Sequence, residues 1–290
     1  MQDLLQHLAL VLGQDLSHHR LTPVSGGDIN RAYRLQTASF QAFLKINRSA
    51  LAEMLSAEVE GLQALAASGA VKVPQVLAHG SIGQHAYLLL EYLPLTALTD
   101  RSASLLGVQM ARMHRQTQSY FGWHRDNTIG FTPQSNTPDS DWVSFWGEQR
   151  LGKQLTWAAE KGYTGALQNK GAKLIAALPT FFTDYQPHPS LLHGDCWGGN
   201  AAQDQQGRPV LYDPACYWGD READLAMTEL FGGFGPDFYA AYQSEYPLDP
   251  GYGVRKYLYN LYHILNHLNM FGGGYQAQAL QMMERLLAEV

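Results

Sequence analysis

The sequence has only two cysteines, Cys196 and Cys216, among its 290 residues, and their spacing is not that of a metal site. So few cysteines indicate a reducing compartment rather than a disulfide framework. No apolar run approaches the ~18 residues that a membrane span needs. The first residues also lack the basic stretch and the cleavage site of a signal peptide. We therefore expect a cytoplasmic protein with no membrane partner.

Basic residues are also scarce. Twenty lysines and arginines stand against 26 aspartates and glutamates, which gives a net charge of −6. Such a chain lacks the electrostatic footprint of a nucleic-acid-binding protein. Hydrophobic residues make up 46% and charged residues 16% of the sequence, a balance typical of a globular chain. The sequence does not decide the oligomeric state, for which a monomer is the simplest expectation.

The hydrophobic pattern changes character near Leu93. Before this residue, helical spacing at 3–16 and 51–68 alternates with extended runs, which lie at 32–35, 40–46, 76–79 and 87–93. Pro94 ends the last of these runs. After it, helical spacing dominates, at 102–116, 142–161, 166–185, 222–231, 236–245, 254–271 and 275–290.

Two stretches of the second part, 117–141 and 187–220, read as irregular, and the second contains one short strand at 210–212. The sequence thus predicts an α+β protein of two lobes. Residues 1–93 form a small sheet-rich lobe, and residues 94–290 form a larger, mainly helical lobe. Ligand sites favour such interfaces between lobes.

The densest chemical motif combines His193-Gly194-Asp195 with Asn200, five residues after the aspartate, and with Asp213, thirteen residues further on. Transfer of a phosphoryl group requires these residue types. One aspartate accepts the proton of the attacking hydroxyl, while an asparagine and a second aspartate hold Mg²⁺ on the phosphates of ATP. The spacing matches the kinase catalytic loop H-x-D-x-x-x-x-N with its metal-binding aspartate downstream. A lone H-G-D often only caps a turn, but the two further residues favour catalysis by Asp195 and metal binding by Asn200 and Asp213.

A kinase also needs a lysine on a strand, paired to a glutamate on the next helix. Lys45 lies near the end of the extended run 40–46. In the following helix, Glu58 shares one face with apolar residues, and a charge there is costly unless it is paired. Glu60 falls on the polar face, where we expect it to be solvated. We therefore assign Glu58 as the partner of Lys45.

Two weaker signals fit the nucleotide. Gly26 and Gly27 lie between extended segments ahead of Lys45, where backbone N–H groups could cover phosphates; a plain turn is the alternative. Glu91 and Leu93 end a buried strand at the position where a kinase hinge binds adenine through its backbone.

Two further features have a structural reading. His263 and His267 are four residues apart, as in some zinc sites, but no third ligand accompanies them, which favours a role in the core or in a pocket wall. Asp224 is expected to brace the catalytic loop as a cap.

At these residues the sequence resembles the fructosamine kinase and ketosamine-3-kinase family, a branch of the aminoglycoside-phosphotransferase-like kinases. The resemblance runs from Gly26 to Gly272. It rests on Leu191–Asp195 with Trp197 and Asn200, on Asp213-Pro214-Ala215, on Tyr217-Trp218-Gly219 with Glu222, on Leu230–Phe234, on matches scattered through 129–155, and on Asn266-His267-Leu268-Asn269. It implies a protein-kinase-like fold, with ATP and Mg²⁺ as cofactors.

The resemblance also implies a reaction, which is phosphorylation at O3 of the sugar of a ketosamine, the product of amine glycation. The phosphorylated adduct decomposes and frees the amine. Six residues near the loop or on a late helix are expected to meet this substrate, namely Trp197, Trp218, Asp220, Glu222, His267 and Asn269; bracing of the loop is the alternative for Trp218 and Glu222. Some relatives carry a cysteine in the Gly-rich loop, which permits redox-controlled dimers. This chain has Asp28 there, so such regulation is not expected.

Two other functions stay open. One is a kinase for a different small molecule, an aminoglycoside or an amino alcohol, and the other is a pseudokinase that binds nucleotide without turnover. The second would be suspected if one of the four key residues were replaced, and none is. In the catalytic loop a glycine replaces the arginine of the protein-kinase motif H-R-D, and the motifs D-F-G and A-P-E are absent from the sequence, which disfavours a protein substrate.

Overall fold

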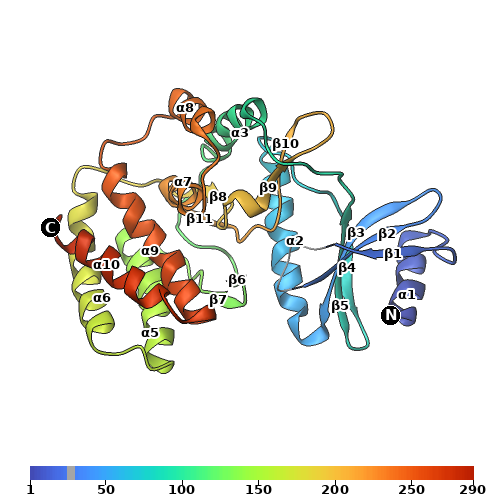
Figure 1. The fold of residues 1–290 in the computed structure, drawn as a ribbon, viewed down its shortest axis with the longest axis horizontal. Helices are drawn as coiled ribbons and strands as arrows, with labels where there is room; N and C mark the ends of the chain where they lie inside the picture. Colours follow the sequence, from blue (N-terminus) through green and yellow to red (C-terminus); the bar gives the residue numbers. More distant parts are fainter. Residues whose placement is uncertain (25–29) are drawn as a thin grey trace.

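The N-terminal lobe is built around a five-stranded antiparallel sheet of order β1-β2-β3-β5-β4 (Figure 1). In this computed structural model the described residues are 1–24 and 30–290. The strands are β1 (Arg20–Pro23), β2 (Arg31–Gln36), β3 (Gln41–Arg48), β4 (Val76–Ile82) and β5 (His85–Glu91). Two helices, α1 (Gln2–Leu12) and α2 (Ala52–Ala67), complete the lobe.

The two helices cover opposite faces of the sheet. Successive side chains of a strand point to opposite faces. In β5, Leu89 packs in the cluster that contains the leucines of α1, whereas Leu88 and Leu90 pack in the cluster that contains those of α2. The strand is thus buried on both sides, which explains its continuous apolar sequence. Both predicted helices of this lobe are confirmed. The first was expected to extend to residue 16, but α1 ends at Leu12, and the next residue, Gly13, adopts a left-handed conformation.

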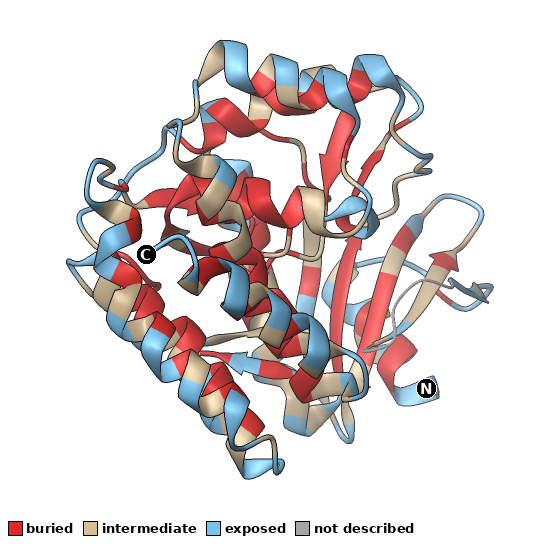
Figure 2. Cartoon of the chain, turned by 60° about the vertical axis from the view of Figure 1, so that its left-hand side comes forward, coloured by how far each residue is buried: buried red, intermediate tan, exposed pale blue. Residues whose placement is uncertain are grey.

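The C-terminal lobe is mainly helical, as predicted. Its longer helices are α3 (Asp100–Met113), α5 (Lys153–Glu160), α6 (Ala166–Ala177), α7 (Arg221–Leu230), α8 (Pro236–Glu245), α9 (Tyr252–Phe271) and α10 (Tyr275–Leu287). A reciprocal capping box between Thr99 and Ser102 starts α3. Figure 2 shows the buried side of these helices turned toward the interior of the lobe.

Some expected elements differ in the structure. The helix expected at 142–161 is divided into α4 (Trp142–Phe145), a π-helical segment (Trp146–Gly152) and α5, and the one expected at 166–185 continues after Ala177 as a 3-10 helix (Leu178–Phe182). The two stretches expected to be mostly irregular contain additional short strands. These are β6 (Asn127–Ile129), β7 (Thr132–Gln134), β8 (Ser190–Leu192), β9 (Ala201–Gln203) and β11 (Tyr217–Gly219), beside the predicted β10 (Pro209–Leu211).

The lobes share apolar packing. The buried face of α2, which includes Leu55, Val59 and Leu62, belongs to the same core cluster as the helices of the C-terminal lobe. An isolated bridge also joins Lys72 of the first lobe to Val210 of the second. Within the described ranges, no helix is both long and apolar enough to cross a membrane.

Candidate active site

The predicted catalytic loop follows β8, and the carboxylate of Asp224 holds its backbone in place. Asp224, in the first turn of α7, accepts hydrogen bonds from the backbone N–H groups of His193 (2.7 Å) and Gly194 (2.8 Å). Its Oδ2 also lies 3.2 Å from Nε2 of His114. Asp224 is buried, and these donors outweigh the cost of burial and hold its pKa below the usual range. The bracing role expected for Asp224 is therefore confirmed.

A glycine is required in this loop for two reasons. Gly194 adopts a φ of +82°, a conformation that side-chain-bearing residues rarely adopt, and a Cβ there would lie 2.0 Å from the carbonyl oxygen of Ala215. The loop is thereby pressed against the segment that follows Asp213. His193, also buried, lies with its Nε2 3.0 Å from the carbonyl oxygen of Tyr212. These contacts hold the His193-Gly194-Asp195 segment against the chain on either side of Asp213.

Asp195 and Asn200 are in direct contact. The side-chain amide of Asn200 donates to Oδ2 of Asp195 at 3.0 Å and to the Asp195 carbonyl at 2.9 Å. Burial raises the pKa of Asp195 to about 7. A carboxylate with a pKa near neutrality is suited to taking and returning a proton at physiological pH.

Asp213 lies on the other side of Asn200, whose amide nitrogen is 3.5 Å from the Asp213 carbonyl oxygen. Its backbone has a φ of +55°, the one positive value among the non-glycine residues that the structure describes, and strained backbone of this kind is frequent at functional sites. Its side chain is 45% exposed. The site therefore offers a carboxylate and an amide oxygen, the hard ligands that Mg²⁺ prefers.

Lys45 connects the two lobes at this point. Its Nζ lies 2.7 Å from Oε1 of Glu58 and 2.5 Å from Oδ1 of Asp213, and the residue is 6% exposed. Burial opposes the charge of the lysine, but the two carboxylates outweigh it and raise its pKa above the usual range. The predicted pairing of Lys45 with Glu58 is confirmed, and the contact with Asp213 adds to it.

Helix α2 also contacts the segment that follows Asp213 in the chain. A Cβ on Gly61 would lie 3.1 Å from Cγ of Pro214 and 3.3 Å from Sγ of Cys216. The absence of a side chain at Gly61 thus lets α2, which carries Glu58, lie directly on this segment.

The expectation that Glu60 is simply solvated is corrected by the structure. Arg125, from the C-terminal lobe, donates to Glu60 at 2.8 Å and to Glu53 at 2.5 Å, and His124 lies 2.6 Å from the second oxygen of Glu60. Glu60 therefore belongs to an ion-pair cluster between α2 and the other lobe, which holds the helix from its polar side. Sequence reasoning missed Arg125, because nothing in its local pattern indicates so distant a partner.

Of the residues expected to bind the nucleotide, the structure describes only some. Gly26 and Gly27 lie outside the described residues. Glu91 is the last residue of β5, where its N–H donates to the Gln75 carbonyl at 2.8 Å, and the chain passes through the half-buried Leu93 toward α3. Contact of Glu91 and Leu93 with adenine stays a prediction.

Two of the expected substrate residues, Trp197 and His267, both contact the ring of Phe231, which lies between them. The exposed ring of Trp197 contacts Phe231 (ring centroids 6.1 Å apart), and Phe231 contacts His267 (5.0 Å). Sequence reasoning did not assign Phe231 to the site, although it belongs to the Leu230–Phe234 motif that carries the family resemblance. Trp218 is half-buried, with its ring 5.8 Å from that of Trp123, and its role toward the substrate stays a prediction.

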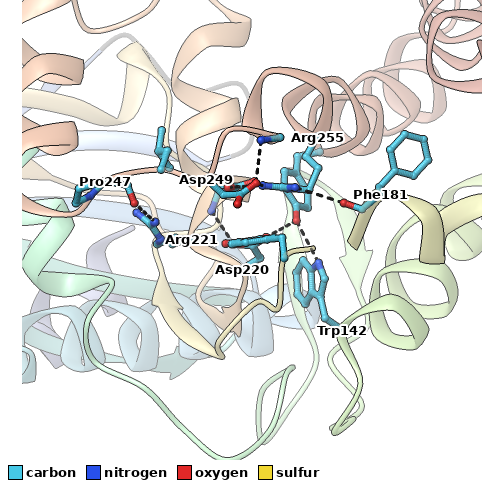
Figure 3. Close-up of polar contacts among 12 residues, drawn as sticks. Trp142, Phe181, Asp220, Arg221, Pro247, Asp249 and Arg255 are labelled. Atoms are coloured by element: carbon cyan, nitrogen blue, oxygen red, sulfur yellow. Dashed lines mark hydrogen bonds and ion pairs between the residues drawn. The ribbon is translucent and has the colours of Figure 1, made fainter. Parts of the chain in front are cut away.

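The substrate roles expected for Asp220 and Glu222 are not supported, because both residues are fully buried and engaged. Asp220 caps α7 and accepts hydrogen bonds from the hydroxyls of Tyr185 and Tyr259 (Figure 3). Glu222 binds the guanidinium of Arg255 through both oxygens, at 2.7 and 3.0 Å. The alternative reading, in which this segment braces the fold, agrees with these contacts.

Asn269 is likewise turned inward. It is 4% exposed, and its amide donates to the backbone and the side-chain oxygen of Gln154, at 2.9 and 2.7 Å. It thus ties α9 to α5, while His267, two residues earlier, remains on the accessible side. The substrate role expected for Asn269 is not supported by this geometry.

Comparison with known proteins places the chain in a family. The sequence model of the fructosamine kinase family matches residues 1–289. The chain is 44% identical to a "probable ketoamine kinase" of Synechocystis sp., covering 99% of this chain and 96% of the relative. It is 39% identical to the chloroplastic protein-ribulosamine 3-kinase of Arabidopsis thaliana, covering 99% and 88%.

Solved structures give the same grouping. A crystal structure of fructosamine-3-kinase type from Thermobifida fusca superposes with a TM-score of 0.88, at 30% identity and 99% coverage of both chains. Aminoglycoside phosphotransferase APH(4)-Ia, at 16% identity and a TM-score of 0.64 over 99% of this chain and 98% of its own, shares the fold alone. The protein has the two-lobed, protein-kinase-like α+β fold predicted above, and the chain belongs to the fructosamine kinase family.

Proposed function

We propose that this protein is an ATP-dependent kinase that phosphorylates O3 of the sugar in ketosamines and so promotes deglycation. The observation that carries the proposal is the Lys45–Glu58–Asp213 constellation beside Asp195 and Asn200, in a chain that the fructosamine kinase model matches almost completely. The relatives named ketoamine kinase and ribulosamine 3-kinase support the acceptor class. The cytoplasmic location, the monomeric state and the lack of a nucleic-acid partner stay predictions.

Each polar residue of the site has a distinct task in this reaction. Asp195 accepts the proton of the attacking hydroxyl, and its contact with Asn200 fixes the direction of its carboxylate. Lys45 provides a fixed positive charge for the nucleotide phosphates, oriented by Glu58. Asn200 and Asp213 would hold Mg²⁺, which neutralises phosphate charge when bound.

The acceptor is expected to sit beside Asp195, against Trp197 and His267. The amine of a ketosamine is at least partly protonated, and an aromatic face attracts such a cation. Trp197 is two residues from the proposed base, so an acceptor within reach of Asp195 would meet this ring.

The test is an ADP-release assay with MgATP and a panel of acceptors. The panel contains a ribulosamine, an erythrulosamine, a fructosamine, an aminoglycoside and an amino alcohol, and the Asp195→Asn variant serves as control. We expect release with at least one ketosamine and a 3-phosphate product identified by ³¹P and ¹H NMR. If only an aminoglycoside or an amino alcohol were turned over, the proposed ketosamine acceptor would be refuted, whereas the proposed kinase activity would stand. Binding of ATP with no turnover of any acceptor would favour the pseudokinase.

A further inference from the structure

A continuous row of aromatic rings leads away from the catalytic loop. It begins at Trp197 and continues through Phe231 to His267, which in turn contacts Phe271 (5.5 Å between ring centroids) and Tyr275 (5.2 Å). These rings come from the catalytic loop, the end of α7, α9 and the start of α10. Four separate parts of the chain therefore contribute to one surface feature.

The row is open to solvent at Trp197 and at Phe271. In the described part of the chain, three Phe or Trp side chains are exposed: Phe131 (54%), Trp197 (37%) and Phe271 (63%). Two of the three thus belong to a single row. Isolated exposed apolar residues need no explanation, but apolar side chains that line up from a reactive group mark a ligand-binding surface.

The first ring of the row packs closely against the backbone. The indole of Trp197 lies across the backbone of Gly199, where a Cβ would come within 2.3 Å of two of its ring carbons. A larger residue at Gly199 would displace the ring. Gly199, next to the predicted metal ligand Asn200, therefore permits this packing of the Trp197 ring.

The central ring suits a cationic ligand. Nδ1 of His267 lies 2.8 Å from the carbonyl oxygen of His263, so this nitrogen carries the proton and donates it. Burial lowers the pKa of His267, which leaves the ring uncharged at neutral pH. A neutral imidazole between aromatic faces does not repel a protonated amine.

We propose that this row, from Trp197 through Phe231 and His267 to Phe271 and Tyr275, binds the amine-bearing portion of the acceptor and selects ketosamines whose amine carries an aromatic or long apolar group. The inference rests on the proposed function. Trp197 lies two residues from Asp195 in the chain, so we infer that a sugar whose hydroxyl reaches Asp195 meets the row at Trp197. The contacts from Trp197 onward then provide a surface for the group that the amine attaches to the sugar.

The experiment compares two acceptors with the same sugar and the same charge, the ribulosamines of methylamine and of phenethylamine. The ratio of their kcat/KM values is measured for the wild type and for Phe271→Ala, Tyr275→Ala and Phe131→Ala. We expect the wild type to prefer the phenethylamine adduct by roughly threefold to tenfold, the scale of one aromatic contact at an exposed site. Phe271→Ala and Tyr275→Ala should reduce this preference through KM.

Phe131→Ala is the matched control, because it removes another exposed phenylalanine that lies outside the row. Phe271 is itself exposed, so its replacement leaves the core intact. An unchanged ratio in both row variants, or an equal loss in Phe131→Ala, would overturn the inference while leaving ketosamine phosphorylation established. If the wild type turned over neither adduct nor any other ketosamine, the proposed function would fail, and this inference with it.

Discussion

Replacing Glu58 by glutamine should damage the use of ATP far more than the same replacement at Glu60. Glu58 and Glu60 lie two residues apart on α2, and each forms an ion pair in the structure. Their surroundings differ, however. The side chain of Glu58 is 12% exposed and its partner Lys45 7%, whereas the side chain of Glu60 is 30% exposed and that of Arg125 25%.

The expected magnitude follows from these surroundings. Removing one partner of a buried pair costs about 3–5 kcal/mol, because the other charge is left uncompensated. Lys45 keeps Asp213 as a second carboxylate, at 2.5 Å, so we expect a smaller loss of about 2 kcal/mol. Because Lys45 is proposed to bind the nucleotide phosphates, we expect a loss of the same order in transition-state stabilisation. At about 1.4 kcal/mol per factor of ten, this corresponds to a loss of roughly 30-fold in kcat/KM for MgATP. Part of the loss should arise because Lys45 then binds Asp213 alone and competes with the metal.

Glu60→Gln provides the matched comparison. Pairs with this degree of exposure contribute about 0–1 kcal/mol, and Arg125 retains Glu53 at 2.5 Å. We expect kcat/KM for MgATP to change by less than about threefold. The assay is steady-state ADP release with varied MgATP at a saturating ketosamine, together with thermal unfolding of each variant. A Glu58→Gln variant within threefold of the wild type, or a larger effect of Glu60→Gln, would refute the reasoning.

Three further substitutions test the catalytic loop. Asp195→Asn should lower kcat by about 10²–10⁴-fold with an unchanged circular dichroism spectrum, since a general base is lost; activity within threefold of the wild type would argue against that role. Asp213→Asn removes an anionic oxygen ligand, so the Mg²⁺ concentration for half-maximal rate should rise; an unchanged Mg²⁺ dependence would contradict metal binding there. Asp224→Asn should destabilise the fold by about 1–3 kcal/mol, because His193 and Gly194 donate their buried N–H groups to different oxygens and asparagine retains only one of the two acceptors; equal denaturation midpoints for variant and wild type would exclude this.

The clustering of the residues predicted to be catalytic could be expected from the sequence, because their spacing is set locally. Asp195 and Asn200 lie on one loop at a fixed spacing, and Asp213 follows one short hairpin later. Glu58 was predictable for a different reason, namely that a charge on the apolar face of a helix demands a partner. Both patterns need only a few consecutive residues to be recognised.

The acidic residues after β11 show where this reasoning ends. Asp220 and Glu222 have the chemistry expected of a binding site for an amine, and they follow Asp213 closely in the sequence. Their actual partners, Tyr185, Tyr259 and Arg255, lie 33 to 39 residues away along the chain. Local sequence patterns do not predict contacts between residues so far apart. The sequence therefore does not distinguish acidic residues that stabilise the fold from acidic residues that bind a ligand.

The division of the helix expected at 142–161 was hidden for a related reason. A π-helical turn adds about one residue per turn and leaves the spacing of apolar residues nearly helical. Phe231 was missed because a phenylalanine carries no chemical signal of its own, and only its contacts with Trp197 and His267 indicate a role.

The packing of α2 against the C-terminal lobe has a consequence for how the molecule loses its structure. This helix carries Glu58, yet its apolar face contributes to the core of the larger lobe, and Gly61 lies against Pro214 and Cys216. A core shared in this way favours cooperative unfolding in a single transition over the separate melting of two domains. Heat would then remove the nucleotide site and the acceptor site together. A partly denatured molecule would not persist as an ATP-binding fragment without a place for its acceptor.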